Sequence, residues 1–402
     1  LVMAHAAFGH NHFFKNNYLF RQWTDADGVL DYFQYAKAYI AKCEERHGLA
    51  EVEAVLDAAH AIMDQGVFRY RRAPELTTAE REARKREIEA YRERTFNDLW
   101  RTVPDNGAGE EADEAELARR RRRRDLKLPE ENLLFFLEHN SPILEGWQRE
   151  ILAIVRNVAQ YFYPQRQTKM MNEGCATFVH HYIMNELYDR GLLTEGALLE
   201  ILHSHSNVIF QPEFDDPRYH GINPYALGFA MMGDIRRICT EPSDEDREWF
   251  PDLAGCGDWR GALREAWANY RDESFIRQYL SPELIRRLRL FDLTDDAKES
   301  HYSVGAIHDE QGYRKVREAL ANSYDPAFTE PDIQVVDTDL RGDRQLYLEH
   351  GVRDGIVLAE EPRQEVLKHL RTLWGYDVTL AGVDRENGKT LYTTSTAEGD
   401  ED

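Results

Sequence analysis

Two histidines near the start of the chain stand among small and apolar residues. The stretch is MAHAAFGHN, residues 3–11, and the histidines are His5 and His10. In an ideal α-helix, residues five apart point in directions roughly 140° apart, so the two imidazoles would not meet. Gly9 would let the backbone break and swing His10 back toward His5. On that arrangement the pair could bind one metal ion.

The pair is similar to the histidines of an H-E-x-x-H metallopeptidase helix, which bind zinc from one helix face. Two differences separate this chain from that motif. Ala6 replaces the catalytic glutamate, and the spacing is one residue longer. The alternative is a pair of packed histidines that hydrogen-bond to each other, and the residues leave both interpretations open.

A carboxylate that could complete such a site lies in NEGCA, residues 172–176, at the start of a predicted helix. This stretch is similar to the segment that supplies the glutamate ligand of gluzincin-type metallohydrolases. Those enzymes use two imidazoles and a carboxylate, with the fourth position left open. His5, His10 and Glu173 would form that set and hold a divalent metal, zinc by type. Alternatively, Glu173 is a first-turn carboxylate stabilised by the helix dipole.

Three further side chains are candidates for proton transfer or ligation. His180 shares a helix face with Glu173 but lies roughly 10.5 Å along the axis, so we expect a proton donor, an outer group or a ligand of another metal. Glu145 begins an apolar helix and could replace the missing general base, or could be an exposed helix-start glutamate. His203 and His205 point to opposite sides of a helix, so one of them at most faces the site.

Loop residues are candidates for binding polar groups of a substrate. They are Asn16, Asn17, Asn223 and Tyr225. Helix capping would explain the asparagines equally well.

The elements that position these residues are predicted to be mainly α-helical. Apolar residues recur at helical spacing through the first 290 residues, so almost no strand is expected there. The predicted segments are 1–72, a helical part of the core; 73–130, a charged helix and linker; 131–293, the helical core with the His and Glu cluster; 294–385, a small α+β domain; and 386–402, an acidic tail. The capless start at Leu1 suggests a fragment that lacks an upstream part.

The small C-terminal domain is predicted from a change of periodicity. Strands at 333–337 and 345–348 flank a turn at 341–343, with a third strand at 355–359. A helix at 362–374 and a last strand at 376–380 follow. The run of six arginines, Arg119 to Arg124, is expected in a solvated, charge-paired linker; contact with nucleic acid or an acidic partner is the alternative.

Composition excludes some classes of protein. The 402 residues carry a net charge of −23, which argues against a general nucleic-acid binder. There is no apolar run of about 20 residues and no leader, so we expect a cytoplasmic protein with no membrane contact. Four cysteines, none in a C-x-x-C motif, are expected to be reduced thiols.

Several motifs together resemble one family. They are GHN (residues 9–11), FFKNN (13–17), WQRE (147–150), MNEG (171–174) and INPY (222–225). The sequence is similar to the SpoVR family, the proteins like stage V sporulation protein R, and closer to its branch in non-sporulating bacteria and archaea. The resemblance runs from His5 to about Leu380 and is weakest in the charged linker.

The resemblance implies a role in spore cortex formation or in stress responses, and two partners, a PrkA-type serine protein kinase and a von Willebrand-type protein. It also places histidines at His180 and His205, which favours His205 over His203 as a metal ligand. The family usually has Trp at the position of Cys175, so the pocket shape differs here. Two functions follow: a zincin-like metallohydrolase with a helical core, or a non-catalytic regulatory module, which Ala6 favours.

Overall fold

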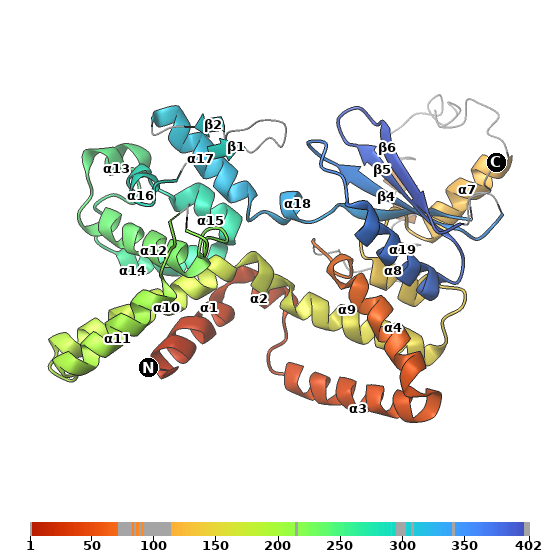
Figure 1. Ribbon diagram of the computed structural model, residues 1–402, viewed down its shortest axis with the longest axis horizontal. Helices are drawn as coiled ribbons and strands as arrows, with labels where there is room; N and C mark the ends of the chain where they lie inside the picture. Colours follow the sequence, from red (N-terminus) through yellow and green to blue (C-terminus); the bar gives the residue numbers. More distant parts are fainter. Residues whose placement is uncertain are drawn as a thin grey trace. The chain divides into compact units, whose positions relative to one another are not determined.

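The computed structural model describes residues 2–70, 83, 86–87, 90–91, 114–213, 216–290, 292–294, 303–306, 309–339 and 342–397. This part of the chain is mainly helical, as predicted (Figure 1). The chain forms two compact units, and each is built from two separate stretches: Leu1–Tyr39 with Asn157–Asp332, and Ile40–Arg156 with Ile333–Asp402. The sequence predicted a linear succession of segments, whereas these units alternate along the chain. Most of the predicted linker at 73–130 lies outside the described residues.

The described residues of the first unit are helical apart from one pair of short strands. Its elements are the π-helix η1 (Met3–His10), α1 (Asn11–Asn16), α2 (Tyr18–Trp23), α10 (Lys169–Asp189), α11 (Glu195–Val208), α12 (Pro224–Thr240), α13 (Asp244–Trp249), α14 (Trp259–Asn269), α15 (Asp272–Tyr279), α16 (Pro282–Arg287), the antiparallel strands β1 (Asp292–Thr294) and β2 (Ser303–Ala306), α17 (Glu310–Asn322) and α18 (Pro326–Thr329). Helices α3 (Val29–His47) and α9 (Gly146–Gln167) each contribute residues to both units.

The core of the first unit is formed where α1, α10, α12 and α14 meet. Phe13, Met171, Leu227, Met231 and Leu263 are fully buried there in one apolar cluster. Their spacing on each helix matches the apolar face expected from the sequence. Helix α10 runs through the middle of this cluster, so residues along it are held on several sides.

Glycines let the backbones of three helices touch. A Cβ on Gly9 of η1 would lie 2.6 Å from Cα of Ala176 on α10. A Cβ on Gly174 of α10 would lie 2.6 Å from Cα of Gly228 on α12. Real Cβ atoms do not approach other atoms so closely, so any larger residue would force the helices apart. Helix α10 is therefore packed between η1 and α12 at backbone contact.

A buried carboxylate fixes the start of α10. The two oxygens of Asp272 accept hydrogen bonds from the backbone N–H groups of Met170 and Met171, both at 2.8 Å. These N–H groups have no partner within the helix, so the side chain satisfies them from outside. Burial raises the pKa of Asp272 to about 7, although the two hydrogen bonds act in the opposite direction. The first turn of α10, which precedes Asn172 and Glu173, is thereby held in place.

The second unit contains a four-stranded sheet with helices. The strands are β3 (Ile333–Thr338), β4 (Leu346–Val352), β5 (Val378–Asp384) and β6 (Thr390–Ser395), in the order β3-β4-β5-β6. The β4–β5 pair is parallel, and the other two pairs are antiparallel. The helices are α4 (Leu49–Ala61), the 3₁₀-helix η2 (Met63–Gln65), α7 (Glu114–Asp125), α8 (Leu133–Asn140) and α19 (Glu360–Trp374), which joins β4 to β5.

The small C-terminal sheet and its helix are confirmed, with two corrections. The strand predicted at 355–359 is wrong, because Asp354 and Gly355 form a turn with positive φ and the chain then leads directly into α19. The acidic tail predicted from 386 is also wrong in its first part, because β6 lies there and pairs with β5. Its threonines and Tyr392 favour a strand, and this signal was hidden by the acidic residues that follow.

The arginine run is better anchored than a solvated linker would be. It lies on α7, where Nε of Arg119 contacts Oδ2 of Asp337 on β3 at 2.6 Å. The Arg122 guanidinium lies 3.6 Å from the same carboxylate. The Asp337 side chain is buried, and a buried carboxylate needs such partners. Arg119 and Arg122 therefore compensate the buried negative charge of Asp337 in the sheet. Arg120, Arg121 and Arg124 are exposed.

The glycine contacts give a test of the fold. We expect Gly228→Ala to lower the free energy of unfolding by about 1–3 kcal/mol, because its Cβ would collide with the Met170 carbonyl and Gly174. Gly233→Ala on the same helix meets no atom within 4 Å and should raise that free energy by about 0.5–1 kcal/mol. Urea unfolding of both variants measures the difference. Equal effects at the two positions would contradict the close helix contact.

Candidate metal centre

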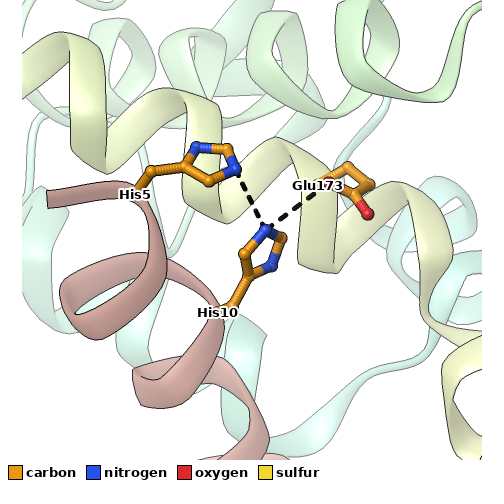
Figure 2. A group of neighbouring side chains, drawn as sticks. All are labelled: His5, His10 and Glu173. Atoms are coloured by element: carbon orange, nitrogen blue, oxygen red, sulfur yellow. Dashed lines mark hydrogen bonds and ion pairs between the residues drawn. The ribbon is translucent and has the colours of Figure 1, made fainter. Parts of the chain in front are cut away.

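The structure brings His5, His10 and Glu173 together, as Figure 2 shows. One ligand atom from each side chain can be chosen so that all three lie within 4.8 Å of one another. Nε2 of His10 is 3.0 Å from Nε2 of His5 and 3.7 Å from Oε2 of Glu173. Among the described residues, this is the group of three or more His, Cys, Asp or Glu side chains that could hold a metal ion. The role as ligands stays a prediction.

The π-helix explains how histidines five residues apart share a face. The N–H of Asn11 bonds to the carbonyl of Ala6, five residues earlier. With this bonding, residues five apart lie one turn apart, whereas an α-helix would separate them. The two imidazole centroids are accordingly 4.6 Å apart. The break predicted at Gly9 is wrong, because the helix continues into α1 and Gly9 instead allows the contact with α10.

Each of the three side chains has a second polar neighbour, and for His10 that neighbour is a hydrogen-bond partner. Nδ1 of His10 lies 2.9 Å from Oδ1 of Asn172. The backbone of Ala176 is among the groups that shift the pKa of His5, and burial and then Glu173 raise the pKa of Tyr225, so these groups are neighbours. Histidines that bind metals almost always use their second ring nitrogen as His10 does, which fixes the ring and its tautomer. The arrangement leaves the Nε2 atoms of both histidines facing each other and the carboxylate.

The distances and charges suit a divalent ion. Burial lowers the pKa of His5, and His10 lowers it further, although Glu173 acts in the opposite direction. A lowered pKa keeps the imidazole neutral, and the neutral form is the ligand. Ligand atoms about 2.0–2.2 Å from one tetrahedral ion lie roughly 3.3–3.6 Å apart. The 3.0 and 3.7 Å separations require small adjustments to meet that spacing, and the remaining pair, His5 with Glu173, lies within 4.8 Å.

A second cluster of histidines lies beside the first. His180 is 6.2 Å from His5 between ring centroids, and His205 lies 6.3 Å from His180 and 5.0 Å from His181. The sequence grouped His205 with the metal ligands, but the structure places it with His180 and His181. His181 was missed, although its position next to His180 in the sequence is a signal. Nε2 atoms of His180 and His205 are buried without a hydrogen-bond partner in the described structure.

Glu145 belongs to the second unit, whereas His5, His10 and Glu173 belong to the first. Its side chain is exposed and accepts a hydrogen bond of 3.2 Å from the Trp147 indole. These contacts are typical of an exposed glutamate at the start of a helix, which was the alternative to a general base in the sequence.

The asparagines predicted to bind substrate have structural contacts instead. Asn17 is buried, donates to the carbonyls of Trp267 and Tyr270, and caps α2. Asn223 caps α12 and donates to the carbonyls of Val208 and Phe210.

Asn16 is exposed and donates to the carbonyl of His12 within its own helix. Tyr225, in contrast, is a neighbour of Glu173, because burial and then Glu173 raise the pKa of its hydroxyl. Of the four residues predicted to bind substrate, Tyr225 is therefore the one that the described structure places in the cluster.

Comparisons with known proteins identify the family of the chain. A family model described as SpoVR like protein matches residues 1–328, which include both histidine clusters and Glu173. A second model, the SpoVR-like C-terminal domain, matches residues 331–385. The chain belongs to the SpoVR family. It is 52% identical over 380 residues to YcgB, an uncharacterized protein of Escherichia coli strain K12, and the match covers 94% of this chain and 73% of YcgB. The resemblance found in the motifs is confirmed.

No solved structure matches the chain. Within the described residues, no helix has an apolar stretch long enough to cross a bilayer.

The buried imidazole of His205 predicts a stability that depends on pH. Burial, and then His181 and His180, lower its pKa from 6.5 to about 4. The unfolded chain therefore binds this proton more tightly than the folded chain, and stability falls as pH falls from about 6.5 to about 4, by up to about 1.4 kcal/mol per unit of pH. His205→Leu should remove this part of the acid sensitivity in urea unfolding, whereas His203→Leu, at an exposed position of the same helix, should retain it. Parallel pH profiles for wild type and His205→Leu would contradict the assignment.

Proposed function

We propose that this protein binds one divalent metal ion, zinc by type, through His5, His10 and Glu173, and that the centre serves a hydrolytic reaction. The observation that carries the proposal is the convergence of two imidazoles and a carboxylate within 4.8 Å, with His10 also bonded to Asn172. Two neutral imidazoles and one carboxylate are the protein ligands of many catalytic zinc sites, in which a fourth position stays open. This set of ligands is the feature in which the chain is similar to zincins.

Each residue of the site would have its own role. His5 and His10 would hold the ion, Glu173 would offset its charge, and Tyr225 would orient the carboxylate. A bound zinc ion would supply a Lewis acid for polarising a substrate oxygen. His180 is half-buried beside His5 with an unpartnered Nε2, so it could hold or move a proton at that atom.

A second function is proposed on a different observation. Ala6 stands where a metallopeptidase helix has its general base, and Glu145 belongs to the other unit. A centre without a carboxylate base suits a non-catalytic regulatory module in which the metal would stabilise the fold. The family resemblance suggests a PrkA-type serine protein kinase and a von Willebrand-type protein as its partners, in a stress response or in sporulation.

The metal ligands can be tested by metal analysis of the purified protein. We expect Glu173→Gln to lower zinc affinity at least tenfold to a hundredfold, because the amide keeps the shape of the side chain but removes its charge. Asn172→Ala should lower the affinity by about tenfold, because His10 loses the contact that orients it. Glu186→Gln, at an exposed carboxylate of the same helix, is the control and should bind zinc normally. Equal zinc content in all three variants would contradict the site.

Complementation separates the two functions. In a host that lacks its own SpoVR-family protein, the enzyme proposal predicts that Glu173→Gln fails to restore stress survival. A His180→Gln variant that keeps its zinc should lose about 10²–10⁴-fold in rate if it transfers a proton, and should also fail. Glu145→Gln should complement fully. Complete rescue by a metal-free Glu173→Gln protein would rule out the enzyme and favour the regulatory module.

A further inference from the structure

Two cysteines of the first unit, Cys239 and Cys256, lie next to each other. Cys239 is buried near the end of α12, and Cys256 is exposed in the loop between α13 and α14. Both are free thiols in the structure. Burial, and then the side chain of Cys256, raise the pKa of Cys239 to about 12, so the two thiols are neighbours.

Two backbone hydrogen bonds hold the loop against the end of α12. The N–H of Gly255 donates to the carbonyl of Ile238, and the N–H of Gly257 donates to that of Cys239, both at 2.9 Å. The nitrogen of Gly257 is two bonds from Cα of Cys256, and the carbonyl oxygen of Cys239 is two bonds from its own Cα. The two Cα atoms are therefore less than about 8 Å apart. Disulfides span Cα separations of about 4.4–6.8 Å, so the backbone holds the cysteines at or close to that separation.

Glycines on both sides of Cys256 make this loop possible. Gly255 and Gly257 have φ angles of +74° and +75°, which residues with a Cβ rarely adopt. The N–H of Cys256 itself donates to the carbonyl of Leu253 at 3.2 Å, and Asp258 then caps α14. The backbone therefore fixes the position of Cys256, although its side chain is exposed.

Two neighbouring thiols can bind a metal or form a disulfide. A cysteine zinc site needs further ligands to complete its four. Among the described residues, the group of three or more side chains that could hold an ion is His5, His10 and Glu173, which contains no cysteine. One exposed thiol beside one buried thiol is the arrangement of a redox pair, in which the exposed thiol meets the oxidant and the second one resolves the product.

We propose that Cys239 and Cys256 are a redox modification site, which hydrogen peroxide converts into a disulfide. The thiolate sulfur of Cys256 attacks one peroxide oxygen, the O–O bond breaks, and the other oxygen leaves as water after protonation, so that Cys256 becomes a sulfenic acid. The sulfur of Cys239 then attacks the sulfur of Cys256. The S–S bond forms, the S–O bond breaks, and the Cys239 proton leaves with the hydroxyl as water.

The electrons of this sequence balance. The two thiols lose two electrons, and one hydrogen peroxide takes them up to give two waters. A dithiol reductant restores both thiols by thiol–disulfide exchange and is itself oxidised to a disulfide. The modification is therefore reversible.

The disulfide would tie the end of α12 to the residues just before α14. Both helices contribute to the apolar core around α10, through Leu227 and Leu263, and Gly228 of α12 touches α10. A crosslink that closes a short loop stabilises a protein mainly by restricting its unfolded chain. Oxidation would strengthen the packing around α10 without using the metal ligands, so the inference does not depend on the proposed function.

Peptide mapping after treatment with hydrogen peroxide tests the proposal on the full chain, with a chelator present to prevent metal-catalysed oxidation. Trypsin cleaves after Arg237, Arg247 and Arg260, which places the two cysteines on separate peptides. We expect peptides 238–247 and 248–260 to be joined after the treatment and separated by a dithiol. The denatured protein should then show the loss of one pair of its four thiols.

Three variants assign the roles. Cys256→Ser, at an exposed position, should keep all its remaining thiols under the same treatment. Cys239→Ala should stop at the sulfenic acid on Cys256, which dimedone labels, because the resolving thiol is absent. Cys43→Ala removes a buried cysteine of the other unit. It is the matched control and should form the disulfide as wild type does.

Urea unfolding measures the effect on the fold. The equilibrium constant for unfolding should be about a hundredfold lower in the oxidised wild type than in the reduced protein, and treatment should not change it in Cys256→Ser. Other results would overturn the proposal. They are four intact thiols after treatment, a crosslink between two chains, or a bond to Cys43 or Cys175. An oxidised form less stable than the reduced one would also overturn it, because the thiols would then have to be pulled together.

Discussion

The candidate site depends on the backbone contact of α10 with η1 and α12. Gly9, Gly174 and Gly228 remove the side chains that would keep these helices apart. Since the backbones touch, side chains from neighbouring helices can meet: His5 and His10 from η1 converge with Glu173 from α10, and Tyr225 from α12 is a neighbour of Glu173. Asp272 adds a fixed start to α10. The geometry of the cluster is thus set by packing, and its chemistry by the residues that project from it.

Residue types predicted which side chains form the site better than they predicted its geometry. The triad could be predicted because two imidazoles and a carboxylate stood on apolar helices, and the motif around Glu173 indicated a ligand. The π-helix could not be predicted, because a single sequence gives no sign of i to i+5 bonding. The sequence could not distinguish helix capping by Asn17 and Asn223 from substrate binding, because the same asparagine amide can hydrogen-bond to the backbone or to a substrate.

The fold was predictable where periodicity was strong. Helical spacing in the first 290 residues and the short alternating strands after Ile333 are local signals, and the described structure contains both. The pairing of distant segments into two units left no such signal, because each unit combines stretches separated by more than a hundred residues. For the same reason, no local signal showed to which unit Glu145 belongs. A residue can look suited to catalysis in the sequence and still belong to the unit that does not contain His5, His10 and Glu173.

The π-helix has a consequence for how such sites are found. A π turn is equivalent to an α-helix that has accepted one inserted residue without unwinding. Removing one residue between His5 and His10 would give the four-residue spacing that zinc-binding helices commonly use. The insertion lengthens the motif but keeps both imidazoles on the same side. Motif searches limited to three- and four-residue spacings would therefore pass over histidine pairs of this kind, and a wide helical turn beside a glycine contact is the feature that would reveal them.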